Sequence, residues 1–241
     1  MTLDRSTRVV LLAAISATIA GLLLAAHPRS GSAQEGQGAA DARGTAAAVQ
    51  AFYNQTNGVR SSFYQTYYNK LYDRYDRSRG TVTFKKPGKM RWEYNRPNGK
   101  VIAADGTQLT VYTPGDAGER GQCFRQQMSA HQLPQAFSFL TGTGRLEEDF
   151  TFRLLDPARQ GYGEGYVLEL TPREPSPHYE RILFYVMKQN GRPTGVVRRV
   201  LIVDSAGNRN RFDFSNMEWN PRTTASSFRF SPPAGVRCVT P

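Results

Sequence analysis

The chain has 241 residues, of which 39% are hydrophobic and 21% charged, and its formal net charge is +11. This length is enough for one domain with a hydrophobic core. The positive charge favours anionic lipid surfaces or acidic partners, but the basic residues are scattered and no nucleic-acid-binding motif is present. The composition therefore argues against a nucleic-acid partner and leaves much of the charge as a solvated surface.

The first 33 residues have the layout of a cleaved secretory signal peptide. Arg5 and Arg8 precede an apolar run over residues 9–26, and the small residues of Gly31-Ser32-Ala33 offer a cleavage point. The alternative is an uncleaved membrane anchor, because the run reaches the lower limit for spanning a bilayer. No cysteine lies near the site, which argues against acylation of a new N-terminal cysteine. We therefore expect an exported protein.

The segment after the leader is predicted to begin the folded part. Residues 34–43 are rich in Ala, Gly and Gln and are predicted to be flexible, and residues 44–241 are predicted to form a single domain. A helix is expected over Thr45–Tyr53, because Val49, Phe52 and Tyr53 have the apolar spacing of one helix face. Asn57-Gly58 ends it.

Residues 59–76 carry a periodicity that fits either a helix or a strand. Tyr64, Tyr68 and Tyr72 recur every four residues, beside a second series of apolar residues with the same spacing. The tyrosine-rich composition favours one long strand. A turn is then expected over residues 76–80, followed by a short strand over Thr81–Phe84.

Residues 80–114 predict an antiparallel meander with one apolar face. Proline and glycine over residues 85–88 mark the first turn, and Asn98-Gly99 and Asp105-Gly106 are strong hairpin signals. Between the first two turns, Met90, Trp92 and Tyr94 alternate with charged residues. These three side chains are therefore expected on one half-buried face.

The rest of the chain predicts further strands and one more helix. A helix is expected over Ser129–Leu140, where Leu133, Phe137 and Leu140 share one face, and it would plug the sheet or lie across an opening. The expected fold is mainly β (α+β), an unclosed antiparallel barrel or strongly curved sheet. The other strands are predicted over residues 122–125, 149–155, 165–171, 180–187, 195–203, 209–218 and 226–231.

No residue pattern for catalysis or for metal binding is found. His131 and His178 have no ligand partners at metal spacing, and no nucleophile motif or phosphate-binding glycine loop is present. The carboxylates of residues 147–149 read as a solvated strand entry. Cys123 and Cys238 either form a disulfide, which an oxidising compartment permits, or remain two buried thiols. We expect no enzyme activity and no cofactor.

Several motifs together resemble the LolA family of periplasmic outer-membrane lipoprotein carriers. The resemblance covers most of residues 44–240 and rests on a Lys-Lys-Pro-containing strand pair and a C-terminal Ser-Pro-Pro-Ala-Gly-Val. The matching stretches are Phe84–Tyr94, Asp105-Gly106 with Leu109, Val111–Pro114, Leu133–Gly142, Leu170–Pro172 and Phe228–Val236.

This resemblance implies a helix-covered β-barrel whose apolar cavity holds the acyl chains of lipoproteins. A helical lid would close that cavity over its cargo. The implied partners are acylated lipoproteins, an inner-membrane lipoprotein-releasing ABC transporter, and an outer-membrane acceptor lipoprotein or the outer membrane itself. The carrier would be a monomer without cofactors. The expected cavity residues are Phe84, Met90, Trp92, Tyr94, Leu109, Val111, Phe137 and Leu140.

One position departs from the family pattern. Carriers of this family place an arginine immediately before the strand-turn proline, where it latches the lid, but here the residue is Lys86. Lysine is a point charge without the planar donor fork of arginine. We expect Lys86 to make a weaker latch, with Arg91 as an alternative donor.

Two other functions stay open on the sequence alone. An envelope lipid- or glycolipid-binding protein could have the same fold and a different cargo. A secreted hydrolase on a β scaffold would need a nucleophile–base pair that the sequence does not offer.

Overall fold

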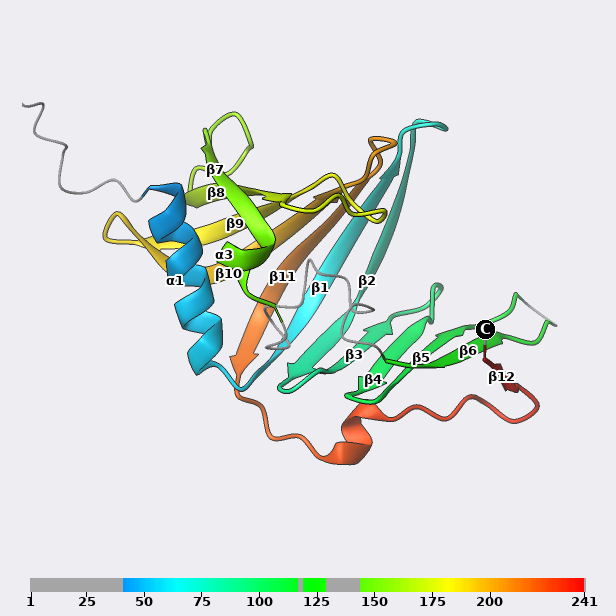
Figure 1. Ribbon diagram of the computed structural model, residues 1–241. Coiled ribbons are helices and arrows are strands. Elements are labelled where there is room, and N and C mark those ends of the chain that lie inside the picture. The colour runs from blue at the N-terminus through cyan, green and yellow to red at the C-terminus, as the bar shows by residue number, and fades with distance from the viewer. Residues whose placement is uncertain (1–40, 117–118, 129–143, 241) are drawn as a thin grey trace, which may run out of the picture. The chain divides into compact units, whose positions relative to one another are not determined.

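The computed structural model describes residues 41–116, 119–128 and 144–240, which lie in one compact unit that begins at Gln37. Most of these residues form one large sheet (Figure 1). Its strands are β1 (Gly58–Asn69), β2 (Arg74–Lys85), β3 (Lys89–Tyr94), β4 (Val101–Asp105), β5 (Gln108–Thr113), β6 (Gln122–Gln127), β7 (Phe150–Leu155), β8 (Gly165–Pro172), β9 (Arg181–Gln189), β10 (Arg192–Val203), β11 (Arg209–Trp219) and β12 (Cys238–Val239).

The sheet is curved but not closed. Its strand order is β12-β6-β5-β4-β3-β2-β1-β11-β10-β9-β8-β7, so β12 and β7 are its two edges among the described residues. Neighbouring strands are antiparallel, except that β12 runs parallel to β6. The predicted mainly β, unclosed antiparallel architecture is thus confirmed.

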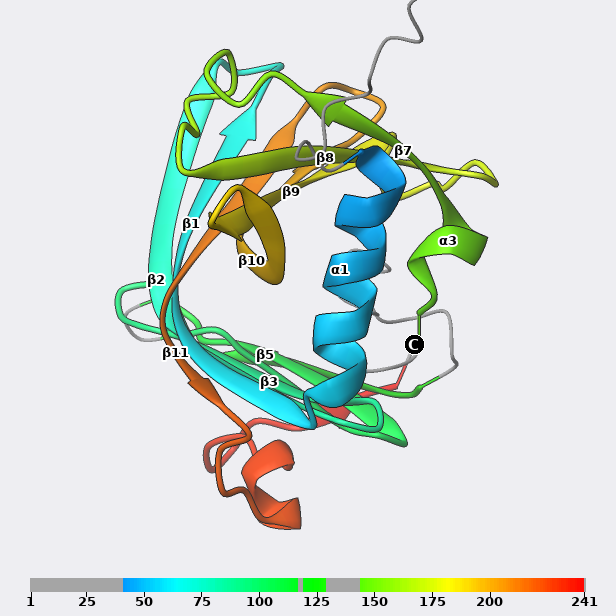
Figure 2. The same ribbon diagram turned by 90° about the vertical axis from the view of Figure 1, so that its left-hand side faces the viewer.

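Helix α1 (Ala42–Gln55) crosses the concave side of this sheet (Figure 2). The Asp41 side chain accepts a hydrogen bond from the Gly44 N–H and so caps the first turn. The helix buries Ala46, Val49 and Tyr53 toward the strands.

Close approach between α1 and β10 depends on Gly195. A Cβ at this position would lie 2.4 Å from the Ala48 carbonyl oxygen, and the residue has a φ of +84°. The helix therefore packs directly against the backbone of the strand.

The predicted meander is confirmed strand by strand. Residues 80–114 contain the C-terminal half of β2 followed by β3, β4 and β5, each paired with the next. Gly88, Gly99 and Gly106 occupy the turns with positive φ, as the turn chemistry requires.

The prediction of one long strand over residues 59–76 is wrong. The chain turns back at residues 70–73, and Asn69 pairs with Arg74 to close a hairpin of two 12-residue strands. The predicted turn over residues 76–80 lies inside β2. The real turn contains neither glycine nor proline, and Asp73 supplies its positive φ of 46°.

Three further expectations differ from the structure. The helix begins at Ala42, inside the stretch predicted as a flexible leader. The carboxylates of residues 147–149 are largely exposed and come directly before β7, as predicted, but they lie in a short helix that was not predicted, α3 (Leu146–Asp149). The strand predicted over residues 226–231 is replaced by the 3-10 helix η1 (Ala225–Phe228), in a segment whose prolines cannot donate ladder hydrogen bonds.

The predicted signal peptide and the predicted helix over residues 129–140 lie outside the described residues. No helix in the described part of the chain has the length and apolar character needed to cross a membrane.

Candidate functional site

The concave face of the sheet carries the main apolar cluster of the protein. Phe84, Met90 and Trp92 are almost completely buried there, and Tyr94 is partly buried beside them. Glu93 lies exposed on the opposite face. The alternation predicted for residues 89–94 therefore places these side chains as expected.

Aromatic rings surround Trp92 on this face. Its ring centroid lies 5.0 Å from that of Phe63, 5.6 Å from that of Phe84 and 5.2 Å from that of Phe212. Edge-on and tilted contacts of this kind are the preferred geometry for buried aromatic pairs. Phe63 and Phe212 are not among the predicted cavity residues, although the period-2 pattern of residues 209–219 indicates the latter.

A small cavity lies between this cluster and α1. The volume of this cavity is about 10 Å³, which is room for about one water molecule. The residues that line it are apolar except for one serine and a tyrosine hydroxyl: Tyr53, Val59, Ser61, Val82, Phe84, Val197, Val200, Phe214 and Met217.

The apolar face continues from Trp92 across the neighbouring strands to the sheet edge. The strand register places Trp92 opposite Ile102, Ile102 opposite Val111, and Val111 opposite Phe124. Val239 of β12 is in turn opposite Phe124. Residues directly opposite each other in a ladder share one face, so these five form an apolar row.

Burial falls steadily along the apolar row. Trp92 is buried, Ile102 and Val111 are partly exposed, and Phe124 and Val239 are 47% and 54% exposed. Leu109 lies two residues from Val111 on the same face of β5 and packs against the core cluster. A strip of hydrocarbon-like surface thus leads from the packed interior to the edge of the sheet. The predicted cavity residues Phe137 and Leu140 lie outside the described residues.

Lys86 contacts the end of α1. Its Nζ donates hydrogen bonds to the carbonyl oxygens of Tyr53 and, at 3.5 Å, of Asn54. A cation at a helix C-terminus also interacts favourably with the helix dipole. Burial lowers the pKa of Lys86. The residue therefore joins the turn between β2 and β3 to the helix that crosses the concave face.

Arg91 does not share this role. It lies on the convex face, where its guanidinium donates 2.9 Å to the Arg229 carbonyl oxygen and forms an ion pair with Glu93. The hypothesis that Arg91 substitutes for the family arginine is wrong, because side chains of adjacent residues in β3 point to opposite faces.

Two buried tyrosines contribute to the concave face. Burial raises the pKa of Tyr94 to about 12. Burial also raises the pKa of Tyr53, against a lowering contribution from its hydrogen bond with the Val197 N–H. Both phenols stay neutral at physiological pH, so they add no charge to the apolar interior.

A disulfide between Cys123 and Cys238 joins β6 to the C-terminal segment, with the two Cα atoms 4.3 Å apart. Upstream of Cys238, this segment runs along the convex face, where the Phe230 ring packs 5.3 Å from the Tyr112 ring.

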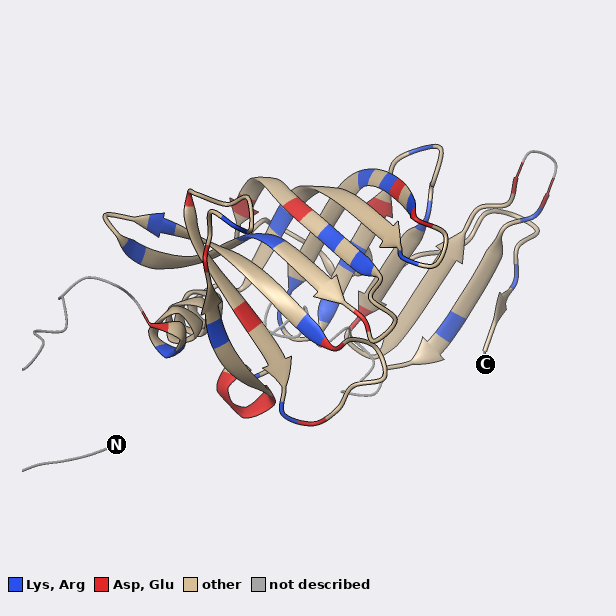
Figure 3. Cartoon of the chain, turned by 90° about the horizontal axis from the view of Figure 1, so that it is seen from above, with Lys and Arg blue, Asp and Glu red and all other residues tan. Residues whose placement is uncertain are grey.

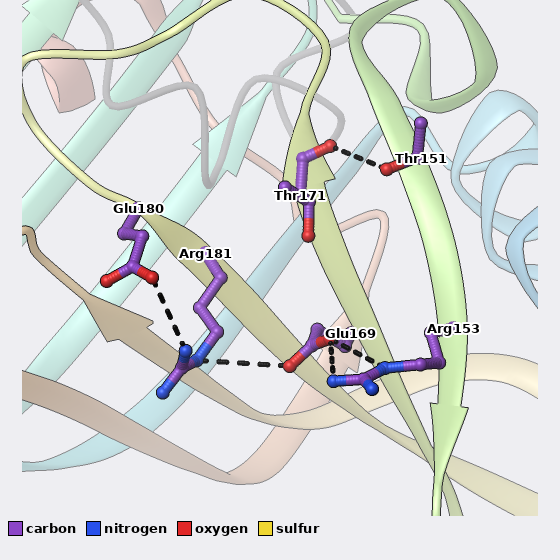
Figure 4. Close-up of polar contacts among 6 residues, drawn as sticks. All are labelled: Thr151, Arg153, Glu169, Thr171, Glu180 and Arg181. Atoms are coloured by element: carbon purple, nitrogen blue, oxygen red, sulfur yellow. Dashed lines mark hydrogen bonds and ion pairs between the residues drawn. The ribbon is translucent and has the colours of Figure 1, made fainter.

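The most buried carboxylate in the described part of the chain belongs to Glu169 on β8. Both the Nε and an Nη of Arg153 donate to one of its oxygens, at 3.0 and 2.7 Å, and Arg181 lies 3.9 Å from the other (Figure 4). This charge is neutralised by its partners. Within the described residues, no group of three His, Cys, Asp or Glu side chains could hold a metal ion.

The comparisons with known proteins decide the family. The model of the family "Outer membrane lipoprotein carrier protein LolA" matches residues 54–231. This chain belongs to the LolA family. Outer-membrane lipoprotein carrier proteins of Nitrosomonas europaea and Dechloromonas aromatica are 29% and 28% identical to it. The alignments cover 79% and 78% of this chain, and 86% and 84% of those relatives.

Among solved structures, the chain resembles a LolA superfamily protein from Nitrosomonas europaea, with 18% identity and a TM-score of 0.44. That match covers 80% of this chain and 99% of the other. The family match over residues 54–231 confirms the predicted resemblance to LolA carriers. The proteins of this family are carriers and not enzymes.

Proposed function

We propose that this LolA protein binds the acyl chains of lipoproteins on its concave face and carries them through the periplasm to the outer membrane. The observation that supports this most directly is the apolar row. It offers a binding strip whose inner end is dry and whose outer end, at Phe124 and Val239, is open to an arriving chain.

Hydrocarbon chemistry explains why such a strip is needed. Burial of each methylene is worth about 0.8 kcal/mol, so exposing one acyl chain of about 16 carbons to water costs on the order of 10 kcal/mol. A carrier that crosses an aqueous space must cover this surface. Rings such as Trp92 and thioethers such as Met90 provide an adaptable lining.

The concave interior must open for cargo to enter. Ligand sites for molecules of this class occupy about 300–1,000 Å³, whereas the cavity beneath α1 holds about one water molecule. That cavity is therefore too small for an acyl chain in the described conformation. Opening requires one of two changes: either α1 moves away from the strands, or the apolar row becomes uncovered.

Lys86 would restrain that movement. Its hydrogen bonds to the last turn of α1 hold the helix against the β2–β3 turn in the closed state. Because they are made by a lysine and not by the planar fork of an arginine, we expect the closed state to be held less firmly than in relatives that have the arginine.

Site-specific photo-crosslinking tests the location of the cargo. A photoreactive residue at Val111 or Phe124, on the apolar row, should crosslink to a triacylated lipopeptide. The same residue at Tyr64, on the convex face, serves as the control and should not. Equal crosslinking at all three positions, or crosslinking at Tyr64 alone, would contradict the proposal.

Native mass spectrometry of the protein from its own periplasm identifies the cargo class. Bound acylated polypeptide supports lipoprotein carriage, with an inner-membrane ABC transporter as donor and an acceptor lipoprotein or the outer membrane as recipient. Bound glycolipid without polypeptide would instead favour the second candidate, an envelope lipid-binding protein with the same fold.

A further inference from the structure

The tip of the β1–β2 hairpin exposes apolar side chains that the other described residues leave uncovered. Leu71 is 82% exposed, Tyr72 is 73% exposed, and Tyr75 is half exposed just behind them. The tip lies at one end of the unit, next to the loop that joins β10 and β11 (Figure 1). Exposed apolar patches of this kind mark interaction sites.

Hydrogen bonds hold the tip in this exposed conformation. The Lys70 N–H donates to Asn208 Oδ1 at 2.9 Å, the Tyr72 N–H donates to Asn69 Oδ1 at 3.2 Å, and the Tyr68 hydroxyl donates to Asp73 at 2.9 Å. These contacts fix both ends of the turn. Leu71 and Tyr72 are thus presented outward by an ordered turn.

A basic aromatic surface leads up to the tip on the convex side. Register pairs place Tyr68 opposite Tyr75 and Arg209, with Tyr64 opposite Arg79 one step further along. We call the set that shares this face the Arg–Tyr face: Tyr64, Tyr68, Tyr75, Arg77, Arg79, Arg209 and Arg211.

Arginine and tyrosine contact each other throughout the Arg–Tyr face. The guanidinium carbon of Arg209 lies 4.7 Å from the Tyr68 ring centroid, and that of Arg77 lies 5.7 Å from the Tyr75 centroid. Two carboxylates adjoin this face and are outnumbered by its four arginines: Asp213 is engaged by Arg211 and Arg199, and Asp73 accepts a hydrogen bond from the Tyr68 hydroxyl. Lys and Arg recur along these and other strands of the sheet (Figure 3). The face therefore keeps a net positive charge.

We infer that the β1–β2 tip, with the Arg–Tyr face behind it, docks on an anionic phospholipid surface. Tyrosine and basic residues concentrate at membrane–water interfaces, where the ring lies at headgroup depth and the cation meets lipid phosphate. An aliphatic side chain at the tip, such as Leu71, would enter the acyl boundary just below.

The shape of the tip favours a bilayer over a protein partner. Stable protein interfaces bury at least about 1,000 Å² with complementary shape, and a convex four-residue turn offers no comparable surface. A bilayer deforms around such a turn. One short insertion gives only weak, reversible attachment, which suits a protein that must leave the membrane again. This inference goes beyond the proposed carrier function and does not depend on it.

Vesicle sedimentation tests the inference, using the exported protein recovered in soluble form. We expect binding to vesicles of phosphatidylglycerol and phosphatidylethanolamine, much weaker binding to phosphatidylcholine vesicles, and loss of binding at high salt. Leu71→Ser combined with Tyr72→Ser should lower the partition coefficient at least about tenfold. Met187→Ser, which alters another exposed apolar side chain on the convex face, is the control and should leave it unchanged.

A second pair of variants tests the charge. Arg77→Gln with Arg209→Gln should weaken binding by about 25-fold, since each of the two cations near an anionic surface is worth about fivefold. Arg43→Gln with Arg222→Gln removes the same charge from exposed sites outside the Arg–Tyr face and should weaken it less. Circular dichroism verifies that each variant is folded.

Three results would overturn the inference. These are no binding of the unaltered protein to anionic vesicles, unchanged binding of the tip variant, or an equal loss in the Arg43/Arg222 control. Lipopeptide binding without vesicles reports separately on the carrier function. A tip variant that still binds lipopeptide but not vesicles would separate the two.

Discussion

The two faces of the curved sheet use aromatic residues in opposite ways. On the concave face, phenylalanine and tryptophan rings such as Phe63 and Trp92 pack against one another in a dry cluster. On the convex face, tyrosines such as Tyr64 lie beneath arginine side chains and are partly exposed. Consecutive residues, Phe63 and Tyr64, belong to different environments.

This difference shows that aromatic content alone does not indicate a lipid site. The alternation of side chains along each strand assigns one residue to the interior and the next to the exterior. The two faces differ in whether their side chains end in a polar group. A phenol or guanidinium on the convex face can remain hydrated while its apolar part packs. Around Trp92 the contacts described on the concave face are with other rings, those of Phe63, Phe84 and Phe212.

The largest expected effect comes from truncating the centre of the concave cluster. Trp92→Ala should lower the free energy of unfolding by about 3–5 kcal/mol, because it leaves a cavity among buried rings. Tyr64→Ala alters a ring on the convex face of β1 and should lower the free energy of unfolding by less than about 1 kcal/mol. Urea denaturation measures both. Similar losses would mean that the faces do not differ in packing as described.

Raising the pH should weaken the concave face through Tyr94. Its pKa is about 12 in the folded protein against an ordinary value of 10.0. The stability that goes with this shift is fully present below pH 10 and is lost as the pH rises through 12. The loss amounts to up to about 3 kcal/mol, and Tyr94→Phe should remove it from the urea-denaturation profile. Parallel profiles for the two proteins would contradict the assignment.

The smallest expected effect concerns the contact between the last turn of α1 and the β2–β3 turn. Lys86→Leu should speed amide hydrogen exchange in the last turn of α1 by about fivefold, since a net hydrogen bond is worth about 1 kcal/mol. Lys86→Arg should preserve protection. Lys100→Leu, which alters a lysine outside this contact, is the matched control. Unchanged exchange in Lys86→Leu would remove this residue from the proposed latch.

The sequence predicted best where local chemistry is explicit. Asn98-Gly99, Asp105-Gly106 and the alternation of Met90 with Trp92 led to the correct meander and to its apolar face. Prediction failed at the β1–β2 turn, because residues 70–73 carry no glycine or proline. A tyrosine repeat every four residues also fits a helix as well as a strand, so it does not show where a strand ends. The apolar row was missed in part, since the place of Phe124 beside Val111 depends on pairing between strands and not on any local motif.

The bond between Cys123 and Cys238 has a consequence for how the molecule behaves among copies of itself. A strand at the border of a sheet offers unsatisfied amide and carbonyl groups that can recruit another chain. Fastening β12 alongside β6 occupies part of that border. The disulfide therefore protects this edge of the sheet against pairing with another chain, and it forms only in a compartment that oxidises thiols.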